Sequence, residues 1–355
     1  MNNLKNKTIA LFFGGRSPEH EISINSAKTV YPLLNQLFFK VYLIYVNKQG
    51  NFFIVNCDSK LKIDNTYSIE NKIKTRNEIS FIANKGIYLN NIKLQLDLAF
   101  ILIHGNEGED GKLQGLLDIM NIKYTGANST SSGICIYKEL TRNILISNNI
   151  NTIDTIVVDS KDKIPNLETI KKKLSNDLFI KSETTGSSIG INALVNPSFD
   201  EFFKAINYSF KYSERVLIQP LLKDIKEVEV AILEKEDHTL IAAGPGLVIK
   251  KNMSDILSYD KKYGNVDSAT INTEIIKDKK LIELLQNQAK QIFKYLNLSG
   301  YSRIDFFIYK DKIYLNEVNT IPGMTSKSHF PLLLERENIS LIDALAKISK
   351  VALKW

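Results

Sequence analysis

Two motifs near the C-terminus restrict what this chain can fold into more than any other segment. Arg303 and Asp305 lie two residues apart in one apolar run, and Glu317 and Asn319 lie two apart in the next. Side chains two apart on a β-strand point to the same face. We therefore predict two adjacent strands that direct an arginine and several oxygen-bearing side chains toward one site. Such a set suits Mg²⁺ carrying a nucleotide's phosphates, because Mg²⁺ takes few protein carboxylates and completes its shell with phosphate and water.

Composition is typical of an ordinary globular protein. The chain has 355 residues, enough for about two or three domains, and 44% of them are hydrophobic. No apolar run approaches the roughly 18 residues that a membrane helix needs, and no signal-peptide core follows the N-terminus. We therefore expect a cytoplasmic protein with no membrane segment. Cys57 and Cys135 indicate a reducing compartment, and each is expected to be a buried thiol.

The net charge of +7 is compatible with two classes of anionic partner, nucleic acid and a small substrate such as ATP. The lysines are spread along the chain, and the densest run, Lys171 to Lys173, is typical of the exposed face of a short helix. A nucleic-acid-binding protein usually gathers its basic residues in one stripe. We therefore expect no nucleic-acid partner.

Apolar periodicity and turn residues predict an N-terminal α/β unit. A buried strand at residues 7–13 ends in a glycine pair, and a helical pattern follows over residues 22–37. The loops come after strand ends, where open sheets bind ligands. Further strands are expected at residues 40–46, 51–55, 79–90, 92–96 and 97–103, with hairpin-like breaks at Lys48-Gln49-Gly50, Asn84-Lys85-Gly86 and Asn90-Asn91. A helix is expected at residues 110–120.

The remaining sequence divides into a mixed segment and a strand-rich segment. We predict an N-terminal domain at residues 1–126, a central domain at 127–218 and a C-terminal domain at 219–355, which contains a polar loop at 251–270. Helices are expected at residues 128–147, 166–175, 199–212, 279–296 and from about 340 onward. Strands are expected at residues 153–158, 178–181, 191–195, 215–222, 227–234 and 239–249, followed by the two motif strands.

Three loops carry side chains that suit charged ligands, and each has a plainer alternative. The Gly- and Ser-rich loop from Lys181 to Gly190 either folds over phosphates or is a flexible hairpin; it is not a Walker A motif. The loop containing Glu19 either holds an ammonium group or uses Ser17 and Glu19 to cap the next helix. The stretch Tyr259–Asn265 is either a lid with a cation and an aromatic or a solvated surface loop.

The four histidines do not indicate a zinc site, because no Cys/His spacing accompanies them. His104 follows an apolar strand and is a candidate for lining a site at the end of that strand. Glu109 and Asp110 come shortly afterwards and are expected to cap the next helix. No G-x-S-x-G motif is present, so the sequence does not indicate a nucleophile elbow.

Taken together and in order, these segments resemble the D-alanine–D-alanine ligase family of ATP-grasp enzymes. The resemblance covers nearly the whole chain. It rests on motifs that are weak or moderate singly but occur in the family's order. They are Gly14 to Ser23, His104 to Gly115, Tyr124 to Gly126, Gly186 to Gly190, Lys262-Tyr263 and Glu317 to Ser326.

The resemblance implies an α/β (α+β) chain with the ATP-grasp fold, in which an N-terminal Rossmann-like domain precedes two α+β domains that clamp ATP. It implies ATP-dependent ligation of two D-alanines through an acyl phosphate, for peptidoglycan precursor synthesis. This chemistry needs charge neutralisation, positioning and water exclusion rather than a protein nucleophile. The implied cofactors are ATP and two Mg²⁺ or Mn²⁺ ions, the implied small-molecule partner is D-alanine, and the implied assembly is a homodimer.

The same resemblance implies roles for individual residues, which fall into four overlapping sets. The metal ligands would be Asp305, Glu317 and Asn319. The ATP contacts would be Lys138, Lys181, Ser187, Gln219, Leu222, Glu227, Lys262, Asn316 and Glu317. The substrate contacts would be Glu19, His104, Arg303, Gly323 and Ser328. The catalytic set would be Glu19, Ser187, Lys262, Tyr263, Arg303 and Gly323, with Tyr263, Ser187 and Glu19 linking the lid across domains.

Two positions depart from the family's usual pattern. Gln219 stands where an acid is usual at the adenine hinge, although its carbonyl can still accept a hydrogen bond from the adenine amino group. His329 follows Ser328 where an apolar residue is common, which would alter the pocket for the second substrate. Residues 45–100 are longer and richer in strands than in compact members.

Rival functions remain at this point. A ligase that joins D-alanine to D-lactate is disfavoured by Lys262-Tyr263, because lactate-using relatives generally lack this tyrosine. Another ATP-grasp carboxylate–amine ligase is disfavoured by the motifs around Glu19 and Ser328. A nucleotide-binding regulator without turnover is a rival from a different class.

Overall fold

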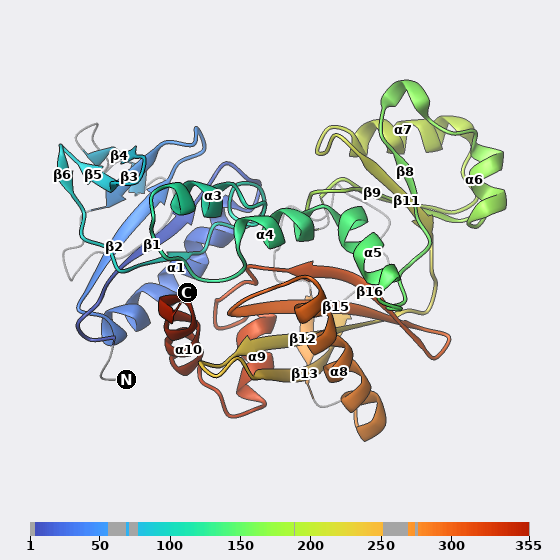
Figure 1. Ribbon diagram of the computed structural model, residues 1–355. Helices are drawn as coiled ribbons and strands as arrows, with labels where there is room; N and C mark the ends of the chain where they lie inside the picture. Colours follow the sequence, from blue (N-terminus) through green and yellow to red (C-terminus); the bar gives the residue numbers. More distant parts are fainter. Residues whose placement is uncertain are drawn as a thin grey trace.

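The computed structural model describes residues 4–55, 69–70, 77–187, 189–250, 269–273 and 276–354. The molecule is elongated, and its sheets form three units in a row. The N-terminal unit lies at one end, the middle unit of the chain at the other, and the C-terminal sheet between them (Figure 1). The division into domains at residues 126 and 218 stays a prediction.

The N-terminal unit is built on a mostly parallel sheet. Its elements are β1 (Thr8–Gly14), α1 (His20–Leu37), β2 (Lys40–Val46), β3 (Phe52–Val55) and β7 (Leu98–Ile101). The strand order is β3-β2-β1-β7, and only β3 runs antiparallel to its neighbour. Strand β1 is buried along nearly its whole length, which explains its continuous apolar run. The loops after β1 and β7 therefore emerge at the same edge of the sheet.

A small antiparallel sheet extends this unit. It consists of β4 (Ile79–Ile82), β5 (Gly86–Leu89) and β6 (Ile92–Lys93). Helix α3 (Lys112–Ile119) follows β7. Residues 79–90 form a hairpin with its break at Asn84 to Gly86, as the sequence predicts, and the strand expected at residues 92–96 is shorter. Asn84, Asn90 and Asn91 have positive φ, which suits turns that reverse the chain.

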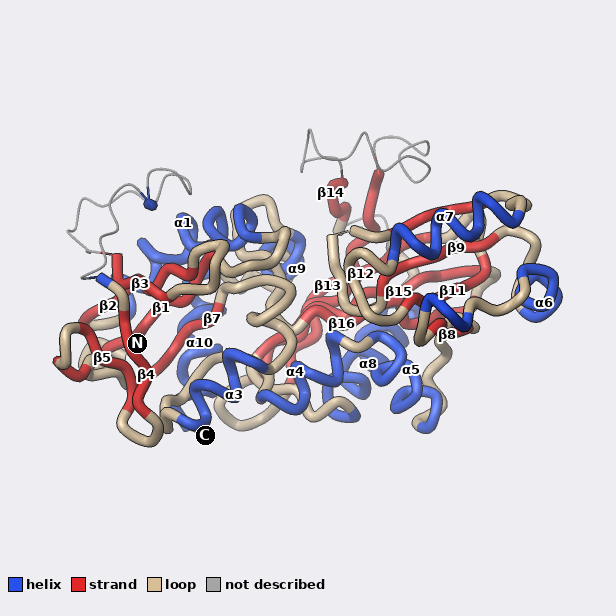
Figure 2. Tube along the Cα trace, turned by 90° about the horizontal axis from the view of Figure 1, so that it is seen from above, coloured by secondary structure: helices blue, strands red, loops and turns tan. Residues whose placement is uncertain are grey.

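The middle unit is an antiparallel sheet with helices on its flank. Its strand order is β10-β9-β11-β8. Figure 2 shows α4 (Ser129–Ile136) and α5 (Lys138–Ser147), the two helices that precede this sheet in the chain, along one edge of the molecule. Its strands are β8 (Ile156–Val158), β9 (Leu178–Ser182), β10 (Ile191–Leu194) and β11 (Val216–Pro220). Its helices are α4 (Ser129–Ile136), α5 (Lys138–Ser147), α6 (Leu167–Lys173) and α7 (Phe199–Ser209), with a 3₁₀ turn, η2, at Lys161–Lys163.

The C-terminal unit is a larger antiparallel sheet with the order β14-β13-β12-β15-β16. Its strands are β12 (Lys226–Glu234), β13 (Leu240–Lys250), β14 (Ala269–Asn272), β15 (Tyr301–Tyr309) and β16 (Lys312–Asn319). Its helices are α8 (Lys279–Tyr295), α9 (His329–Glu335) and α10 (Leu341–Lys354). Buried residues of α9 and α10 belong to the same hydrophobic cluster as residues of β1 and α1, so the two ends of the chain share one core.

Two expectations about helices are corrected. The helix expected at residues 128–147 is two helices, because Tyr137 between them has an extended conformation with φ −83° and ψ 93°. Helix α9 was not expected, since its seven residues are too few to show a clear period. None of the helices that the structure describes has both the length and the apolar character needed to cross a membrane.

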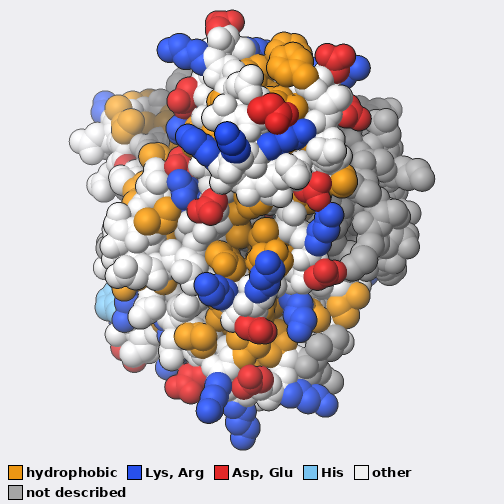
Figure 3. Space-filling model, turned by 90° about the vertical axis from the view of Figure 1, so that its right-hand side faces the viewer, with side chains coloured by type: hydrophobic (Ala, Val, Ile, Leu, Met, Phe, Trp, Pro, Cys, Tyr) orange, Lys and Arg blue, Asp and Glu red, His pale blue; other side chains and the backbone are white. Residues whose placement is uncertain are grey.

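Charged side chains of both signs share the face of the molecule shown in Figure 3. Lys and Arg side chains alternate there with Asp and Glu, and hydrophobic side chains lie between them. The positive charge visible on this face is therefore dispersed rather than gathered into one stripe.

Candidate functional site

The two motif segments are adjacent antiparallel strands in the C-terminal sheet, as the sequence predicts. In their register, Glu229 of β12 lies opposite Asp305 of β15, and Asp305 lies opposite Glu317 of β16. Arg303 lies opposite Asn319 in a nearby row. Directly opposed residues point to the same face of a sheet. The register thus aligns the carboxylates of Glu229, Asp305 and Glu317 in one row, which we call the carboxylate row.

A β-bulge lies next to this row. Asp305 pairs with Glu317, but the next pair along is Phe306 with Leu315, so Asn316 is an extra residue on β16. A bulge bends a strand locally and redirects its side chains, and bulges are common beside active sites. Asn316 lines the pocket that lies next to the row.

Arg303 is held by carboxylates on two strands. Its Nε donates to Oδ1 of Asp305 at 2.8 Å and its Nη2 donates to Oδ2 at 2.7 Å. The same Nε lies 3.2 Å from Oε2 of Glu229. Asn319 also donates from Nδ2 to Oδ2 of Asp305 at 2.9 Å. The planar guanidinium is therefore fixed in orientation by a two-bond fork.

Asp305 is buried beside two other carboxylates. Burial and, after it, the charges of Glu229 and Glu317 raise its pKa to about 7, while Arg303 acts in the opposite direction. A divalent cation at this position would favour the ionised carboxylate. Oxygen donors from Asp305, Glu317 and Asn319 match the preference of Mg²⁺ and Mn²⁺ for hard ligands, so the residues present fit such an ion.

Among the described residues, no group of three or more His, Cys, Asp or Glu side chains could hold a metal ion. The metal set expected from the sequence has two carboxylates and one amide. Mg²⁺ is commonly bound by one or two carboxylates together with water and the phosphates of a substrate.

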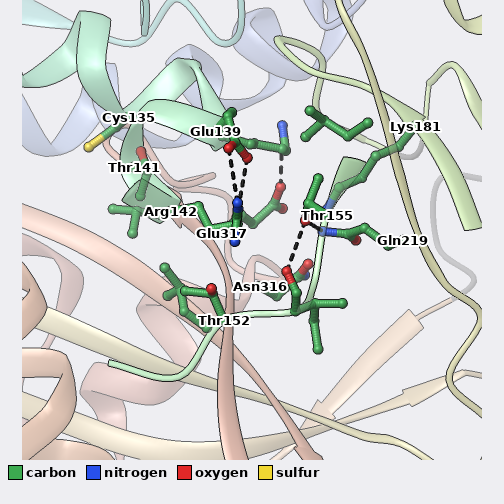
Figure 4. Close-up of a pocket in the computed structure, with 15 residues that line it drawn as sticks. Cys135, Glu139, Thr141, Arg142, Thr152, Thr155, Lys181, Gln219, Asn316 and Glu317 are labelled. Atoms are coloured by element: carbon green, nitrogen blue, oxygen red, sulfur yellow. Dashed lines mark hydrogen bonds and ion pairs between the residues drawn. The ribbon is translucent and has the colours of Figure 1, made fainter. Parts of the chain in front are cut away.

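A pocket between α5, the middle sheet and β16 adjoins the carboxylate row (Figure 4). The space between atoms there is about 390 Å³, which includes open solvent at the mouth of the pocket. Glu317 belongs both to the pocket and to the row, and its Oε2 lies 3.7 Å from Nζ of Lys138. Polar residues of the lining include Lys138, Glu139, Arg142, Thr155, Lys181, Gln219 and Asn316.

Lys181 brings an uncompensated cation into this pocket. It is 7% exposed, and within the part of the chain that the structure describes it makes no ion pair or side-chain hydrogen bond. Burial and the charge of Lys138 together lower its pKa to about 8, while the charge of Glu317 acts in the opposite direction. A buried ammonium group that makes no ion pair is a suitable phosphate contact.

Lys138 ties the Gly- and Ser-rich loop to the pocket. Its Nζ donates to the carbonyl of Glu183 at 3.2 Å and to the carbonyl of Thr185 at 2.8 Å. The first residues of the Gly- and Ser-rich loop are therefore held in place beside Lys138 and Lys181. This favours the phosphate-binding interpretation over the plain hairpin.

Gln219 is oriented by a neighbour in the pocket. Its Nε2 donates to Oγ1 of Thr155 at 2.9 Å, a bond drawn in Figure 4. The side-chain carbonyl makes no hydrogen bond with any described residue. This orientation is the one in which the carbonyl of Gln219 can accept from an amino group.

The N-terminal loop and the Gly- and Ser-rich loop meet through a hydrogen bond. Oγ of Ser187 donates to Oε1 of Glu19 at 2.5 Å, although the two residues are 168 positions apart. Glu19 also lies against Gly105, where a Cβ would come within 2.7 Å of its Oε2. Gly105 has φ +68°, so both the close approach and the backbone favour glycine. Ser17 accepts from the backbone N–H of Glu19, but Glu19 itself makes no side-chain cap.

Both ring nitrogens of His104 are hydrogen-bonded within the protein. Burial is the main reason that its pKa is lowered, so the ring is neutral at neutral pH. Nδ1 lies 2.8 Å from the carbonyl of Ile321, which can only accept, so Nδ1 carries the proton. Nε2 then accepts from Oγ of Ser26 at 3.3 Å. His104 therefore joins the loop after β7 to the loop after β16.

Glu109 does not cap the next helix, which corrects the expectation from the sequence. Its two oxygens accept from the backbone N–H of Gly105 and of Ile321, each at 2.9 Å. Burial and the charge of Glu19 together raise its pKa to about 8. Glu109 thus reinforces the connection that His104 makes between the two loops. Asp110 does accept from the backbone N–H of Lys112 in the first turn of α3, as expected.

Gly323 and Ser328 lie together in the loop before α9. Oγ of Ser328 accepts from the backbone N–H of Thr325 at 3.0 Å. A Cβ on Gly323 would come within 2.8 Å of that same Oγ, so a side chain at position 323 would displace Ser328. The loop therefore presents a backbone N–H and a hydroxyl group side by side.

Some predicted residues lie outside these clusters. Leu222 and Glu227 are not part of the pocket lining, although Glu227 lies two residues before Glu229 on β12 and so shares its face. Lys262, Tyr263 and most of the loop at 251–270 lie outside the described residues. Cys57 also lies outside them, while Cys135 is a buried free thiol as expected.

Sequence reasoning did not single out Glu229. The alternating pattern Lys226-Glu-Val-Glu-Val was visible and placed this acid on a strand face. What the sequence lacked was the register between β12 and β15, which sets Glu229 beside Arg303.

Comparisons with known proteins agree over almost the whole chain. Residues 8–127 match the family model described as D-ala D-ala ligase N-terminus, and residues 144–349 match the one described as D-ala D-ala ligase C-terminus. The D-alanine–D-alanine ligase of Chlorobium phaeobacteroides (strain BS1) is 34% identical over 365 aligned positions, which cover 99% of each chain.

Solved structures show the same fold. The D-alanine–D-alanine ligase of Coxiella burnetii has a TM-score of 0.84 at 27% identity, covering 99% of this chain and 94% of that one. The VanG D-Ala:D-Ser ligase of Enterococcus faecalis has a TM-score of 0.85 at 28% identity, covering 98% of this chain and 100% of that one.

Proposed function

The chain belongs to the D-alanine–D-alanine ligase family, and on that premise we propose that it joins two D-alanines in an ATP-dependent reaction for peptidoglycan precursor synthesis. Its α/β architecture is the ATP-grasp fold. The observation that carries the proposal is the contact between the carboxylate row and the lysine-lined pocket. Glu317 belongs to both and lies beside Lys138.

The nucleotide occupies this pocket in our proposal. Lys138 and Lys181 bind its phosphates, since both side chains line the pocket and Lys181 has no counter-ion among the described residues. The carbonyl of Gln219 accepts from the adenine amino group. Leu222 packs against the base, and Glu227 binds the ribose hydroxyl groups. Asn316, Ser187 and, from the lid, Lys262 complete the contacts.

Asp305, Glu317 and Asn319 would hold Mg²⁺ or Mn²⁺, two ions per site in our proposal. When bound, these ions supply positive charge to the β- and γ-phosphates. The protein's own contribution is to fix the donors: Arg303 and Asn319 both orient the carboxylate of Asp305.

The reaction takes place between the loop that carries Glu19 and the loop that carries Gly323. Glu19 holds the ammonium group of the first D-alanine, beside His104, which shapes the pocket. A carboxylate oxygen of this D-alanine bonds to the γ-phosphorus while the bond from that phosphorus to ADP breaks. Arg303 stabilises the negative charge of the resulting acyl phosphate.

The second D-alanine is held through its carboxylate by Ser328. Its amine attacks the acyl carbon, and the backbone N–H of Gly323 and the guanidinium of Arg303 stabilise the oxyanion. The bond from carbon to the phosphate oxygen then breaks, and the amine loses its proton. Tyr263, Ser187 and Glu19 close the lid over both steps and exclude water. A homodimer in the cytoplasm, where ATP is available, completes the proposal.

The direct test is ADP release with ATP and Mg²⁺, with the product mass recorded. We expect release with D-alanine and a product of D-alanyl-D-alanine mass, and no release with L-alanine. D-Alanine mixed with D-lactate or with D-serine tests the rival second substrates. ADP release that required one of these mixtures would keep the ATP chemistry and overturn the proposed substrate.

We predict that ATP binding weakens as pH rises through the pKa of Lys181, which is about 8. This lysine carries its proton below that pH and loses it above. The KM for ATP should therefore rise about tenfold between about pH 7 and about pH 9, the size of a lost charge-assisted hydrogen bond. Lys181→Arg keeps its charge throughout and should flatten the profile. An equal rise of the KM for ATP in the unmodified chain and in Lys181→Arg would contradict the role of Lys181.

We also predict that Glu227→Ala raises the KM for ATP far more than that for D-alanine. A lost pair of hydrogen bonds from a carboxylate to the ribose should raise it by about tenfold to a hundredfold. The kinetics should be measured with each substrate varied at saturating concentrations of the other. The reverse pattern would mean that the ribose contact is made elsewhere.

A further inference from the structure

The carboxylate of Glu229 joins Arg303 to the start of α9. We propose that Glu229 and His329 are positioning residues, which hold Arg303 in register with the Ser328 segment and so help to bind the second D-alanine. This inference rests on the function proposed above and assigns a role to two residues outside the family's metal and nucleotide sets.

One oxygen of Glu229 contacts both partners. Its Oε2 lies 3.2 Å from Nε of Arg303 and 2.9 Å from Nδ1 of His329. Glu229 is 6% exposed, so these contacts lie away from bulk water. Burial acts to raise its pKa, but Arg303 and His329 outweigh burial and hold it below its usual range. The carboxylate is therefore ionised and can only accept, so Nδ1 of His329 donates.

Glu229 gives the arginine a contact outside the proposed set of metal ligands. Nε of Arg303 is shared between Asp305 at 2.8 Å and Glu229 at 3.2 Å. Asp305 belongs to the proposed metal set, whereas Glu229 does not. A second carboxylate keeps the guanidinium in place whatever else Asp305 binds. Because β12 is hydrogen-bonded to strands on both sides, the backbone that carries Glu229 is well anchored.

His329 extends this anchor to the substrate side. It is the first residue of α9 and directly follows Ser328, which lies against Gly323. The two groups proposed to act on the second D-alanine, Arg303 and the Ser328 hydroxyl, are therefore connected through one carboxylate and one imidazole. A displacement of Arg303 should therefore displace the Ser328 hydroxyl, and the reverse. This would couple binding of the second D-alanine to the chemical step.

A second pair in the protein provides a matched control. Glu234 lies on the same strand, β12, and its Oε1 lies 2.7 Å from Nδ1 of His238. The chemistry is the same, but the side chain of His238 is 64% exposed. Glu234 lies five residues beyond Glu229 in the sequence, outside the carboxylate row.

The experiment compares His329→Leu, His329→Asn, Glu229→Gln and the control His238→Leu. D-Alanine saturation curves at saturating ATP and Mg²⁺ yield separate KM values for the first and second D-alanine, and thermal unfolding reports stability. His329→Leu should raise the KM for the second D-alanine about tenfold and lower kcat, the size of a lost hydrogen bond to a charged group. The KM values for ATP and for the first D-alanine should stay unchanged.

The other variants separate positioning from a general structural role. His329→Asn should restore most of the loss, because its amide nitrogen can donate where Nδ1 did. Glu229→Gln should show the same defect as His329→Leu, and His238→Leu should behave as the unmodified chain.

Two patterns would overturn the inference. One is unchanged kinetics in His329→Leu and Glu229→Gln. The other is a loss in all KM values that follows the melting temperature and that His329→Asn does not restore. If the unmodified chain forms no dipeptide, the proposed function is wrong. The positioning role of Glu229 and His329 is then wrong as well.

Discussion

Replacing Arg303 with lysine should lower kcat by about a hundredfold to a thousandfold, the usual effect of removing a group that stabilises a developing oxyanion. The guanidinium donates through Nε and Nη2 to both oxygens of Asp305 and also contacts Glu229. A lysine ammonium is a point charge and cannot span these acceptors while also facing the substrate. The KM for ATP should change little, because Arg303 is not among the residues that line the nucleotide pocket.

The measurement is steady-state kinetics of ADP release with both substrates varied. Arg215→Lys is the matched control. Arg215 also bridges two carboxylates, with Nε 2.6 Å from Asp159 and Nη1 3.2 Å from Glu183, but it lies on the middle unit. The control should keep the kcat of the unmodified chain. Equal losses in both variants would show that the effect comes from a disturbed fold rather than from the reaction.

Glu317→Gln should abolish measurable turnover, a loss of about a thousandfold or more, because a metal ligand's charge contributes several kcal/mol to stabilising the transition state. Gln has nearly the same shape as Glu, so the substitution mainly removes negative charge. The loss of that charge also leaves Lys138, which lies 3.7 Å from Glu317, without its carboxylate partner.

A metal titration distinguishes this account from a packing defect. If Glu317 is a ligand, Glu317→Gln should need a much higher Mg²⁺ concentration for any residual activity, and its melting temperature without metal should stay near that of the unmodified chain. Near-normal activity at ordinary Mg²⁺ concentrations would rule out the metal assignment.

Local pattern was sufficient to predict most of the fold. The strands β12, β15 and β16 were predicted from apolar alternation, and their side-by-side position brings Arg303, Asp305, Glu317 and Asn319 together. The break between α4 and α5 was missed, because the residues around Tyr137 continue a helical composition while its backbone is extended. Amino-acid composition does not indicate a change of backbone conformation at a single residue.

The parts of the site that were missed depend on contacts between distant segments. Glu109 follows a glycine-rich loop and precedes a helix, which is the usual place for a cap. Its actual partner, the backbone N–H of Ile321, is 212 residues away. Glu229 and His329 are 100 residues apart and meet only because of strand register and the position of α9. No local pattern contains that information, so only the folded chain reveals it.

The central claim is that ligation proceeds through an acyl phosphate, and oxygen transfer tests it most directly. D-Alanine labelled with ¹⁸O in both carboxylate oxygens is supplied with unlabelled ATP and Mg²⁺. The account predicts that one ¹⁸O atom per turnover appears in inorganic phosphate, because the oxygen that bonds to the γ-phosphorus leaves with it. Two labelled D-alanines bring four ¹⁸O atoms, so the other three should be found in the dipeptide, which has three oxygens. Unlabelled phosphate, with the fourth ¹⁸O in water or in the nucleotide instead, would contradict the account.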